Sequence, residues 1–165
     1  MGTVGEMFGH TELAEASIAQ LLACRTALEG ELQSRGYVRT ASSTAGELME
    51  RVVAEAYSGD LTPPGAKGAD VILADGRRLQ VKVRSLPQGD LRHWDFPSVE
   101  FDIAVVIKMD RSTWAIEWAR ELTRAEALVL ARPHAQDGMR IRMGPARQAG
   151  ADVTGKLNAA YWGLR

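Results

Sequence analysis

The segment from Asp70 to Arg84 constrains the fold of this chain most, because its pattern is that of a β-hairpin. Residues Arg78 to Arg84 alternate strictly between polar and apolar side chains, so their polar side chains share one face of a strand. A second short strand, Asp70 to Leu73, precedes them, and the two segments flank Ala74-Asp75-Gly76. An Asp-Gly pair between apolar segments is a strong signal for a tight turn between antiparallel strands.

The length of this turn decides whether Asp70 shares a face with Gln80 and Lys82. A two-residue turn places Asp70 on the opposite face from these two side chains. A three-residue loop, closed by Gly76 in the left-handed conformation, places Asp70 opposite Gln80 and diagonal to Lys82. The sequence leaves both turns open, but a shared polar site requires the three-residue loop or a bulge.

The N-terminal part of the chain predicts one long helix, from about Thr11 to Ser34. Apolar residues recur there at three- and four-residue spacing, from Ala14 to Leu32, and form one stripe. This stripe either packs on the body of the protein or pairs with a second copy in a homodimer. We therefore expect two domains: residues 1–43, an N-terminal helix and connector that is a dimerisation element in the second case, and residues 44–165, an α/β domain.

The C-terminal domain is expected to be α/β, with a mixed central sheet flanked by helices. The expected helices are Ala45–Tyr57, Thr123–Arg132 (capped by Thr123 with Glu126 and stopped by Pro133) and a last helix to Leu164. The expected strands are Asp70–Leu73, Arg78–Arg84, Phe101–Lys108, Thr113–Ala119 and Met139–Met143, the last at a sheet edge. Residues Leu86–Ser98 are expected to form a loop.

Composition excludes several classes of protein. The single cysteine, Cys24, excludes an intramolecular disulfide and a thiolate zinc site. Apolar runs are too short to span a bilayer, and the first ten residues lack the plan of a secretory signal, so we expect a cytoplasmic protein. The net charge of −1 combines an excess of acids in residues 1–60 with an excess of bases in residues 61–165. This charge is compatible with DNA binding but does not by itself indicate it.

A family resemblance rests on the order of these segments. A helix with a glutamate, then Lys67-Gly-Ala-Asp70, a turn and Gln80-Val-Lys82 resemble the PD-(D/E)xK nuclease superfamily, in the Gln-x-Lys variant of Mrr-type restriction domains. The similarity covers about Gly46 to Lys108. It implies a restriction-endonuclease-like core and a DNA endonuclease, dependent on Mg²⁺ or Mn²⁺, that hydrolyses phosphodiester bonds. It also implies a place in restriction or repair, with a protein of such a system as a further partner.

The resemblance also implies roles for individual residues. Asp70, the carbonyl of Gln80 and a helix glutamate would bind the metal, and Lys82 would orient the attacking water. Glu47 and Glu50 both qualify as the helix glutamate, because they are three residues apart on one helix face. Glu47 already has a structural role in a capping box with Thr44, whereas Glu50 has none and matches the family position better, which favours Glu50.

Two further points stay open in the sequence. Gln80 stands where a second carboxylate is common and brings no charge, so metal binding is expected to be weak. The alternative to a nuclease is therefore a catalytically weak or inactive module that binds DNA or a protein partner. Lys67 and Arg84 are expected either to contact DNA phosphates or to be ordinary solvated charges, and the same two interpretations apply to the basic residues Arg140, Arg142 and Arg147.

Overall fold

The computed structural model describes residues 10–16, 18–39, 44–136 and 138–164, and the chain divides into two compact units, residues 1–44 and 45–165. The first unit contains helices α2 (His10–Glu15) and α3 (Ile18–Ser34). The single helix expected over residues 11–34 is therefore wrong. At the end of α2 the amide of Ala16 bonds to the carbonyl of Leu13, an i→i+3 contact that tightens the last turn and interrupts the helical ladder.

Helix α3 ends where the sequence predicts. Gly36 has a φ of +75°, which glycine adopts without steric cost, and the amide of Tyr37 bonds back to the carbonyl of Leu32. On this helix the side chain of Leu28 is 45% exposed, and Cys24 and Leu32 are partly exposed. The apolar residues of the described part of α3 are thus only partly covered within the first unit.

The second unit is a mixed α/β domain that begins with helix α4 (Thr44–Tyr57). Its central sheet has six strands in the order β1-β2-β3-β5-β6-β9, and a second sheet has three strands in the order β4-β8-β7. The strands are β1 (Asp60–Leu61), β2 (Val71–Ile72), β3 (Arg78–Leu86), β4 (His93–Phe96), β5 (Ile103–Asp110), β6 (Ile116–Thr123), β7 (Arg132–His134), β8 (Gly138–Arg142) and β9 (Ala151–Asp152). The remaining helices are α5 (Arg124–Leu130), α6 (Met143–Arg147) and α7 (Thr154–Gly163).

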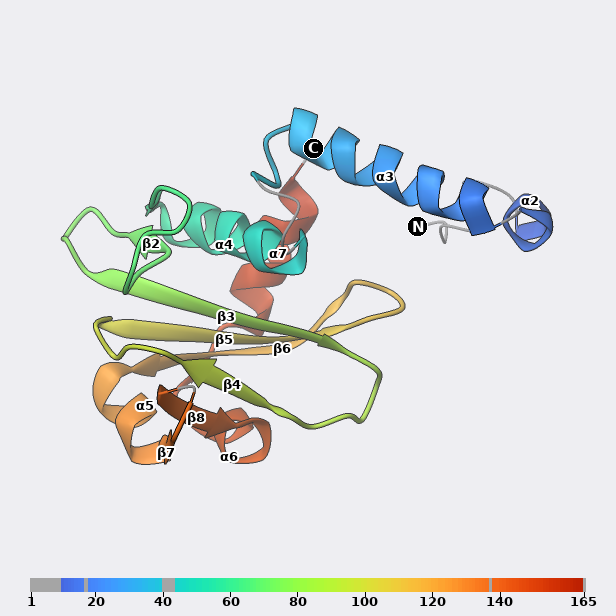
Figure 1. The fold of residues 1–165 in the computed structure, drawn as a ribbon. Coiled ribbons are helices and arrows are strands. Elements are labelled where there is room, and N and C mark those ends of the chain that lie inside the picture. Colours follow the sequence, from blue (N-terminus) through green and yellow to red (C-terminus); the bar gives the residue numbers. More distant parts are fainter. Residues whose placement is uncertain (1–9, 17, 40–43, 137, 165) are drawn as a thin grey trace. The chain divides into compact units, whose positions relative to one another are not determined.

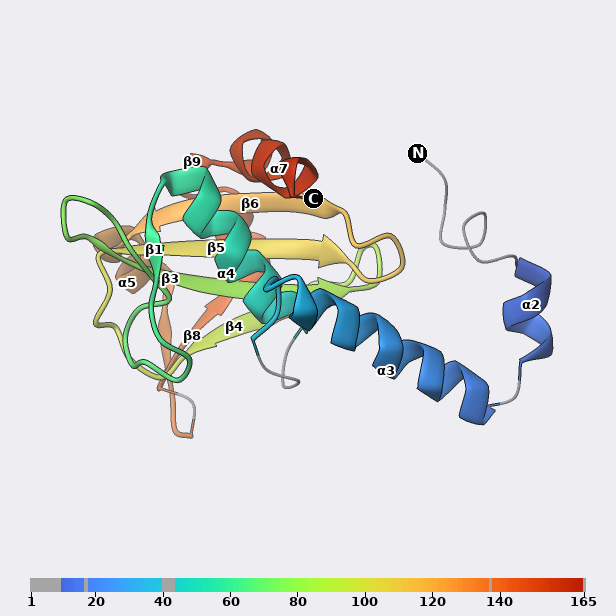
Figure 2. The ribbon, with the colours of Figure 1, turned by 90° about the horizontal axis from the view of Figure 1, so that it is seen from above.

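The two faces of the central sheet have different covers. Helices α4 and α7 lie over one face of the central sheet (Figure 1), and both are seen from above in Figure 2. The small sheet, α5 and α6 lie on the other face, where Trp94 of β4 meets Trp118 of β6 edge to face with ring centroids 5.6 Å apart. Strand β5, covered on both sides, is buried from Ile103 to Met109. Its continuous apolar run predicts this position correctly.

Most predicted elements of this unit are present with shifted ends. The pairing of β5 with β6 is antiparallel, and Thr123 with Glu126 forms the expected capping box of α5. Helix α5 nevertheless ends before Arg132, which begins strand β7, because Pro133 cannot continue a helix but is tolerated in an edge strand.

Two expectations about the small sheet are wrong. Strand β8 is the central strand of its sheet, not an edge strand, because β4 and β7 pair with it on both sides. Strand β4 lies inside the segment 86–98 that the sequence predicts to be a loop. The Pro, Gly and charged residues around β4 obscure it, although its four residues do alternate between polar and apolar.

Candidate functional site

The turn of the hairpin is the three-residue form. Strand β2 pairs with β3 in the register Val71↔Leu79, and the amide of Leu73 bonds to the carbonyl of Arg77 at 2.9 Å. The amide of Gly76, with a φ of +84°, closes the turn onto the carbonyl of Leu73. This register places Asp70 opposite Gln80, so the condition for a shared polar face is met.

Asp70 and Gln80 are in direct contact across the hairpin. The side-chain amide of Gln80 donates a hydrogen bond to Oδ2 of Asp70, and the backbone N–H of Val81 donates to the same oxygen at 2.7 Å. Both side chains are partly buried. A carboxylate held by a backbone amide is fixed in orientation, because the strand that carries the donor cannot turn.

Lys82 occupies the next position on the same face of β3. Its Nζ lies 5.5 Å from the centroid of the Phe96 ring, a cation–π contact with the small sheet. Burial lowers the pKa of Lys82 below its ordinary value, and the charge of Arg84 acts in the same direction. The carboxylates of Asp70, Asp95 and Glu50 oppose that change by favouring the ammonium form.

Glu50 acts on this group electrostatically from a different element. It lies on α4 and is one of the carboxylates whose charge acts on Lys82. The pairing of β2 with β3 begins at Val71 and Leu79, so the part of β3 beyond Gln80 has no strand partner on the β2 side among the described residues. A side chain from α4 can approach the polar face around this open edge.

The competing glutamate, Glu47, lies one helical turn earlier in α4. The helix begins at Thr44, so its N-cap position falls on residue 43, outside the described residues. Arg51, which stands four residues after Glu47 in this helix, forms an ion pair with Glu55 at 3.0 Å. The preference for Glu50 therefore rests on its electrostatic action on Lys82.

Asp95 is a member of the site that the sequence does not predict. It lies on β4, and its carboxylate approaches Arg140 at 2.8 Å, His93 at 3.5 Å and Arg84 at 3.6 Å. Burial acts to raise the pKa of Asp95, but the hydrogen bond from Arg140 and the neighbouring positive charges outweigh it and lower the pKa overall. The period-2 alternation of His93–Phe96 is the one signal in the sequence that identifies this strand.

The two predicted phosphate-contacting residues have different surroundings. Arg84 belongs to the polar face of β3 and donates from Nε to the carbonyl of His93 at 3.1 Å, which ties β3 to β4. Lys67 is exposed in the loop before β2, three residues from Asp70. The structure thus brings Asp70, Gln80, Lys82 and Arg84 together along one hairpin face, and it leaves Lys67 exposed in the loop before β2.

The chemistry of the donors is that of an oxygen-ligand site of low charge. Among residues 10–16, 18–39, 44–136 and 138–164, no three His, Cys, Asp or Glu side chains lie close enough together to hold a metal ion. The carboxylates of Asp70 and Glu50 and the amide of Gln80 are nevertheless the ligand types that Mg²⁺ prefers. For the Gln80 carbonyl to serve, its amide must turn over from the orientation in which it donates to Asp70.

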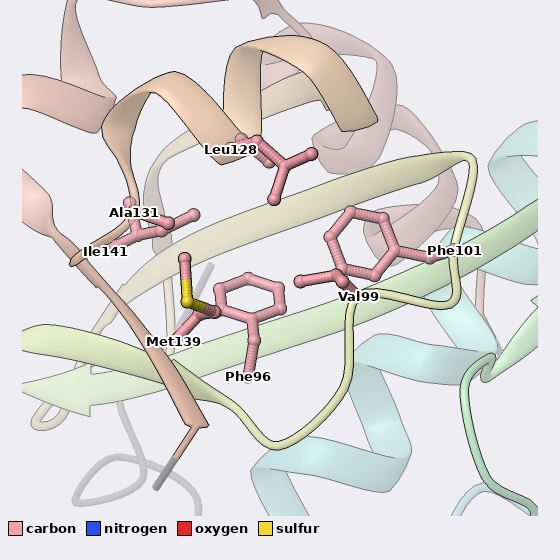
Figure 3. Close-up of a pocket in the computed structure, with 8 residues that line it drawn as sticks. Phe96, Val99, Phe101, Leu128, Ala131, Met139 and Ile141 are labelled. Carbon is pink, nitrogen blue, oxygen red and sulfur yellow. The ribbon is translucent and has the colours of Figure 1, made fainter. Parts of the chain in front are cut away.

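A second feature, an apolar pocket, does not resemble a ligand site. Figure 3 shows the side chains of Phe96, Leu128 and Met139 around it, with carbon and sulfur atoms only. The residues that line it are Phe96, Val99, Phe101, Ala127, Leu128, Ala131, Met139 and Ile141. A pocket without a polar group to orient a ligand is a packing feature of the core, so the polar hairpin face remains the stronger site.

Comparison with models of known protein families gives no match for this chain, and comparison with curated protein sequences gives none either. In the described part of the chain, no helix combines the length and apolar character needed to cross a membrane. The fold and the site are therefore the basis for assigning a class. They define a mixed α/β domain with an Asp–Gln–Lys cluster on a hairpin, and the charges of Glu50 on α4 and Asp95 on β4 act on the lysine of this cluster.

Proposed function

We propose that this protein is a metal-dependent DNA endonuclease of the PD-(D/E)xK type, with a restriction-endonuclease-like core in residues 44–165. The observation that carries the proposal is the hydrogen bond between Asp70 and Gln80, with Lys82 next on the same face. This is the relative placement that the resemblance of the sequence to the family requires. A two-residue turn would have placed Asp70 on the opposite face from Gln80 and Lys82, whereas the observed register places it on their face.

Each residue has a role that its surroundings support. Lys82 contacts the Phe96 ring, and the charges of three carboxylates favour its ammonium form, so this ammonium can orient an attacking water and stabilise negative charge on a phosphoryl oxygen. The backbone N–H of Val81 holds the carboxylate of Asp70 in one orientation. In this orientation the carboxylate can accept a further hydrogen bond or bind a cation. In the reaction the water oxygen bonds to phosphorus, one phosphorus–ester oxygen bond breaks, and the leaving oxygen takes up a proton.

Asp70, Gln80 and Glu50 are the residues that would hold Mg²⁺ or Mn²⁺. A divalent cation supplies positive charge to the phosphate and to the leaving oxygen in such a displacement. With two carboxylates and one neutral amide, we expect the affinity for the cation to be low and to depend strongly on the DNA phosphate as an additional ligand.

The decisive experiment is cleavage of plasmid DNA with and without Mg²⁺. We expect the wild type to relax and linearise the plasmid only when the cation is present, and Lys82→Ala and Asp70→Asn to lose this activity. Lys156→Ala is the matched control for loss of one lysine, because Lys156 lies on α7 over the opposite face of the sheet. Cleavage that survives in both site variants would rule out the assignment.

A binding module without catalytic activity is the second candidate. It is favoured by the neutral Gln80 and by the lack of a third acidic or imidazole ligand near Asp70 and Glu50 among the described residues. DNA binding that weakens with salt but is never followed by cleavage would favour this candidate. A protein partner in place of DNA would show neither behaviour.

Dimerisation through the N-terminal helices is a further part of the proposal. It is supported by the exposure of Leu28 on α3 and by the partial exposure of Cys24 and Leu32 on the same helix. The test is the molar mass in solution of the wild type and of Leu28→Glu. A wild-type monomer would contradict this part and leave the nuclease assignment unaffected.

A further inference from the structure

The outward face of the small sheet is strongly basic. Side chains that stand opposite each other in antiparallel strands share a face, and the pairs His93↔Arg142, Asp95↔Arg140 and Arg132↔Arg140 therefore lie together. His134 continues the same face of β7, opposite Gly138. Trp94 and Phe96 of β4 and Ile141 of β8 point the other way and belong to the buried core. The seven strand positions of this face thus carry three arginines and two histidines and a single carboxylate.

Asp95, the single carboxylate of this face, pairs with two arginines, and the net charge of the face stays positive. Asp95 contacts Arg140 at 2.8 Å and Arg84 of the neighbouring sheet at 3.6 Å. The two positive charges of Arg140 and Arg84 exceed the one negative charge of Asp95. Arg132 and Arg142 add two more positive charges, and both are exposed. The guanidinium of Arg132 bonds to carbonyls at the end of α5, which fixes its position.

The spacing of the arginines suits an extended polyanion. Residues two apart on a strand are separated by about 7 Å, and neighbouring strands by about 5 Å, so the cations of β7 and β8 form a regular array. Arginine matches phosphate geometry with two parallel N–H donors. No Trp, Tyr or Phe occupies a position of this face in the described strands, so the face lacks rings on which bases could stack. This combination favours the phosphates of a duplex, whose bases are turned inward.

The basic face is continuous with the candidate active site. Arg84 lies on the same face of β3 as Gln80 and Lys82, and it bonds to β4 through the carbonyl of His93. Asp95 is one of the carboxylates that act on Lys82. A polyanion that lies along β8 and crosses β4 therefore reaches Arg84, which is two residues from Lys82 on the same strand face.

We infer that the outward face of the β4-β8-β7 sheet binds the phosphate backbone of double-stranded DNA and guides the duplex to the hairpin site. This inference rests on the proposed function for the identity of the polyanion. It assigns Arg140 and Arg142 to binding, and it assigns Asp95 to the positioning of Arg84 and Arg140. Arg147, on α6, is not a member of this face.

The test is DNA binding in the absence of divalent cations, so that cleavage plays no part. A short labelled duplex is titrated by fluorescence anisotropy at several salt concentrations with the full chain, with Arg142→Glu and with Lys156→Glu. Both substitutions reverse one exposed charge, but Lys156 lies on α7, away from the small sheet. Arg142→Gln is a second variant that removes the charge without reversing it, and circular dichroism verifies that each variant is folded.

We expect Arg142→Glu to weaken binding about tenfold at low salt and to reduce the slope of log Kd against log salt by about 0.9, the value for one lost phosphate contact. Arg142→Gln is expected to give the same loss of slope, and Lys156→Glu to behave as the wild type. Equal affinities for Arg142→Glu and Lys156→Glu would overturn the inference, and so would a wild type that does not bind the duplex at low salt.

The outcomes for this face and for the nuclease proposal are separable. Wild-type binding that Arg142→Glu weakens, together with no cleavage in Mg²⁺, supports the basic face and contradicts the nuclease. Cleavage in Mg²⁺ that is unchanged by Arg142→Glu, in KM as in kcat, supports the nuclease and contradicts the basic face. Preference for a single-stranded oligonucleotide over the duplex would also contradict the inference, since it would require stacking on rings that this face lacks.

Discussion

The side-chain amide of Gln80 donates a hydrogen bond to the carboxylate of Asp70 across the β2–β3 hairpin. The contact satisfies the carboxylate with a neutral partner at the position where a nuclease of the proposed type commonly places a second negative charge. Asp70 and Gln80 are consequently hydrogen-bonded to each other before any cation binds. The cost is a weaker attraction for a divalent cation, because an amide oxygen contributes a dipole and no net charge.

The first prediction concerns Gln80→Glu. Without a divalent cation the new carboxylate repels Asp70 and loses the hydrogen bond, so we expect the variant to be less stable than the wild type by about 1–3 kcal/mol. Saturating Mg²⁺ should restore this stability and raise the thermal midpoint of the variant more than that of the wild type. Differential scanning calorimetry with EDTA and with Mg²⁺ measures both effects. Gln148→Glu, on an exposed residue after α6, is the control and should not respond to the cation.

The second prediction concerns Lys82→Met. Burial lowers the pKa of Lys82, so the folded protein binds this proton less well than the unfolded chain does. The charged ammonium therefore reduces stability at pH values below both pKa values, and this penalty disappears as the pH rises past the ordinary lysine pKa of 10.5. We expect Lys82→Met to abolish cleavage while raising the thermal midpoint at neutral pH, with a gain that shrinks as the pH approaches that value. A lower midpoint at pH 7 would contradict the electrostatic account.

The third prediction concerns Asp95→Asn. The carboxylate of Asp95 favours the ammonium form of Lys82, so its neutralisation lowers the pKa of Lys82 further. If cleavage requires the ammonium form, the alkaline limb of the pH–rate profile moves to lower pH in this variant. Asp75→Asn is the control, because Asp75 pairs with Arg77 at the tip of the hairpin. A parallel loss of activity at every pH, without displacement of the limb, would indicate a purely structural role for Asp95.

The fourth prediction concerns an ion pair, away from the site, between a buried lysine and a partly exposed glutamate. The Nζ of Lys108 is 2.5 Å from Oε1 of Glu117, and Lys108 is only 1% exposed. Glu117→Ala leaves a buried ammonium without its counter-ion, and we expect a loss of about 3 kcal/mol in the free energy of unfolding. Urea denaturation measures it. The double variant Lys108→Met with Glu117→Met removes both charges and should recover most of the loss; if it is no more stable than the single variant, the cost is one of packing and not of charge.

The hairpin site could be predicted from the sequence because its determinants are local. The polar face of β3 follows from period-2 alternation, and the turn that precedes β3 uses Gly76, whose φ is +84°. The sequence could not decide between the two turns, since an Asp-Gly pair suits both. The sequence restricts the pairing of β2 with β3 to two registers, and only one of them places Asp70 opposite Gln80.

The strand order of the small sheet could not be predicted from the sequence, because its strands pair with segments that are distant in the chain. Strand β4 has four residues and pairs with β8, which follows it by more than forty positions, so no local pattern indicates the partner. For the same reason the sequence does not indicate Asp95 as a site residue, and it predicts β8 at a sheet edge. A strand is central in a sheet only when strands pair with it on both sides. Strands β4 and β7 have only four and three residues, and an alternation as short as that of β4 is too weak a signal to predict a strand by itself.

The parallel pairing of β3 with β5 has a consequence for the order in which the site forms during folding. The β2–β3 hairpin closes a short loop, a process that takes about 1–10 μs and brings Asp70 to Gln80 early. The parallel pairing and the docking of β4 on β8 require much longer loops to close, which gives this domain a high contact order and a slow final step. In refolding experiments we therefore expect the contact between Asp70 and Gln80 to form before β4 brings Asp95 into place, and the proposed DNA binding to recover only with this later step.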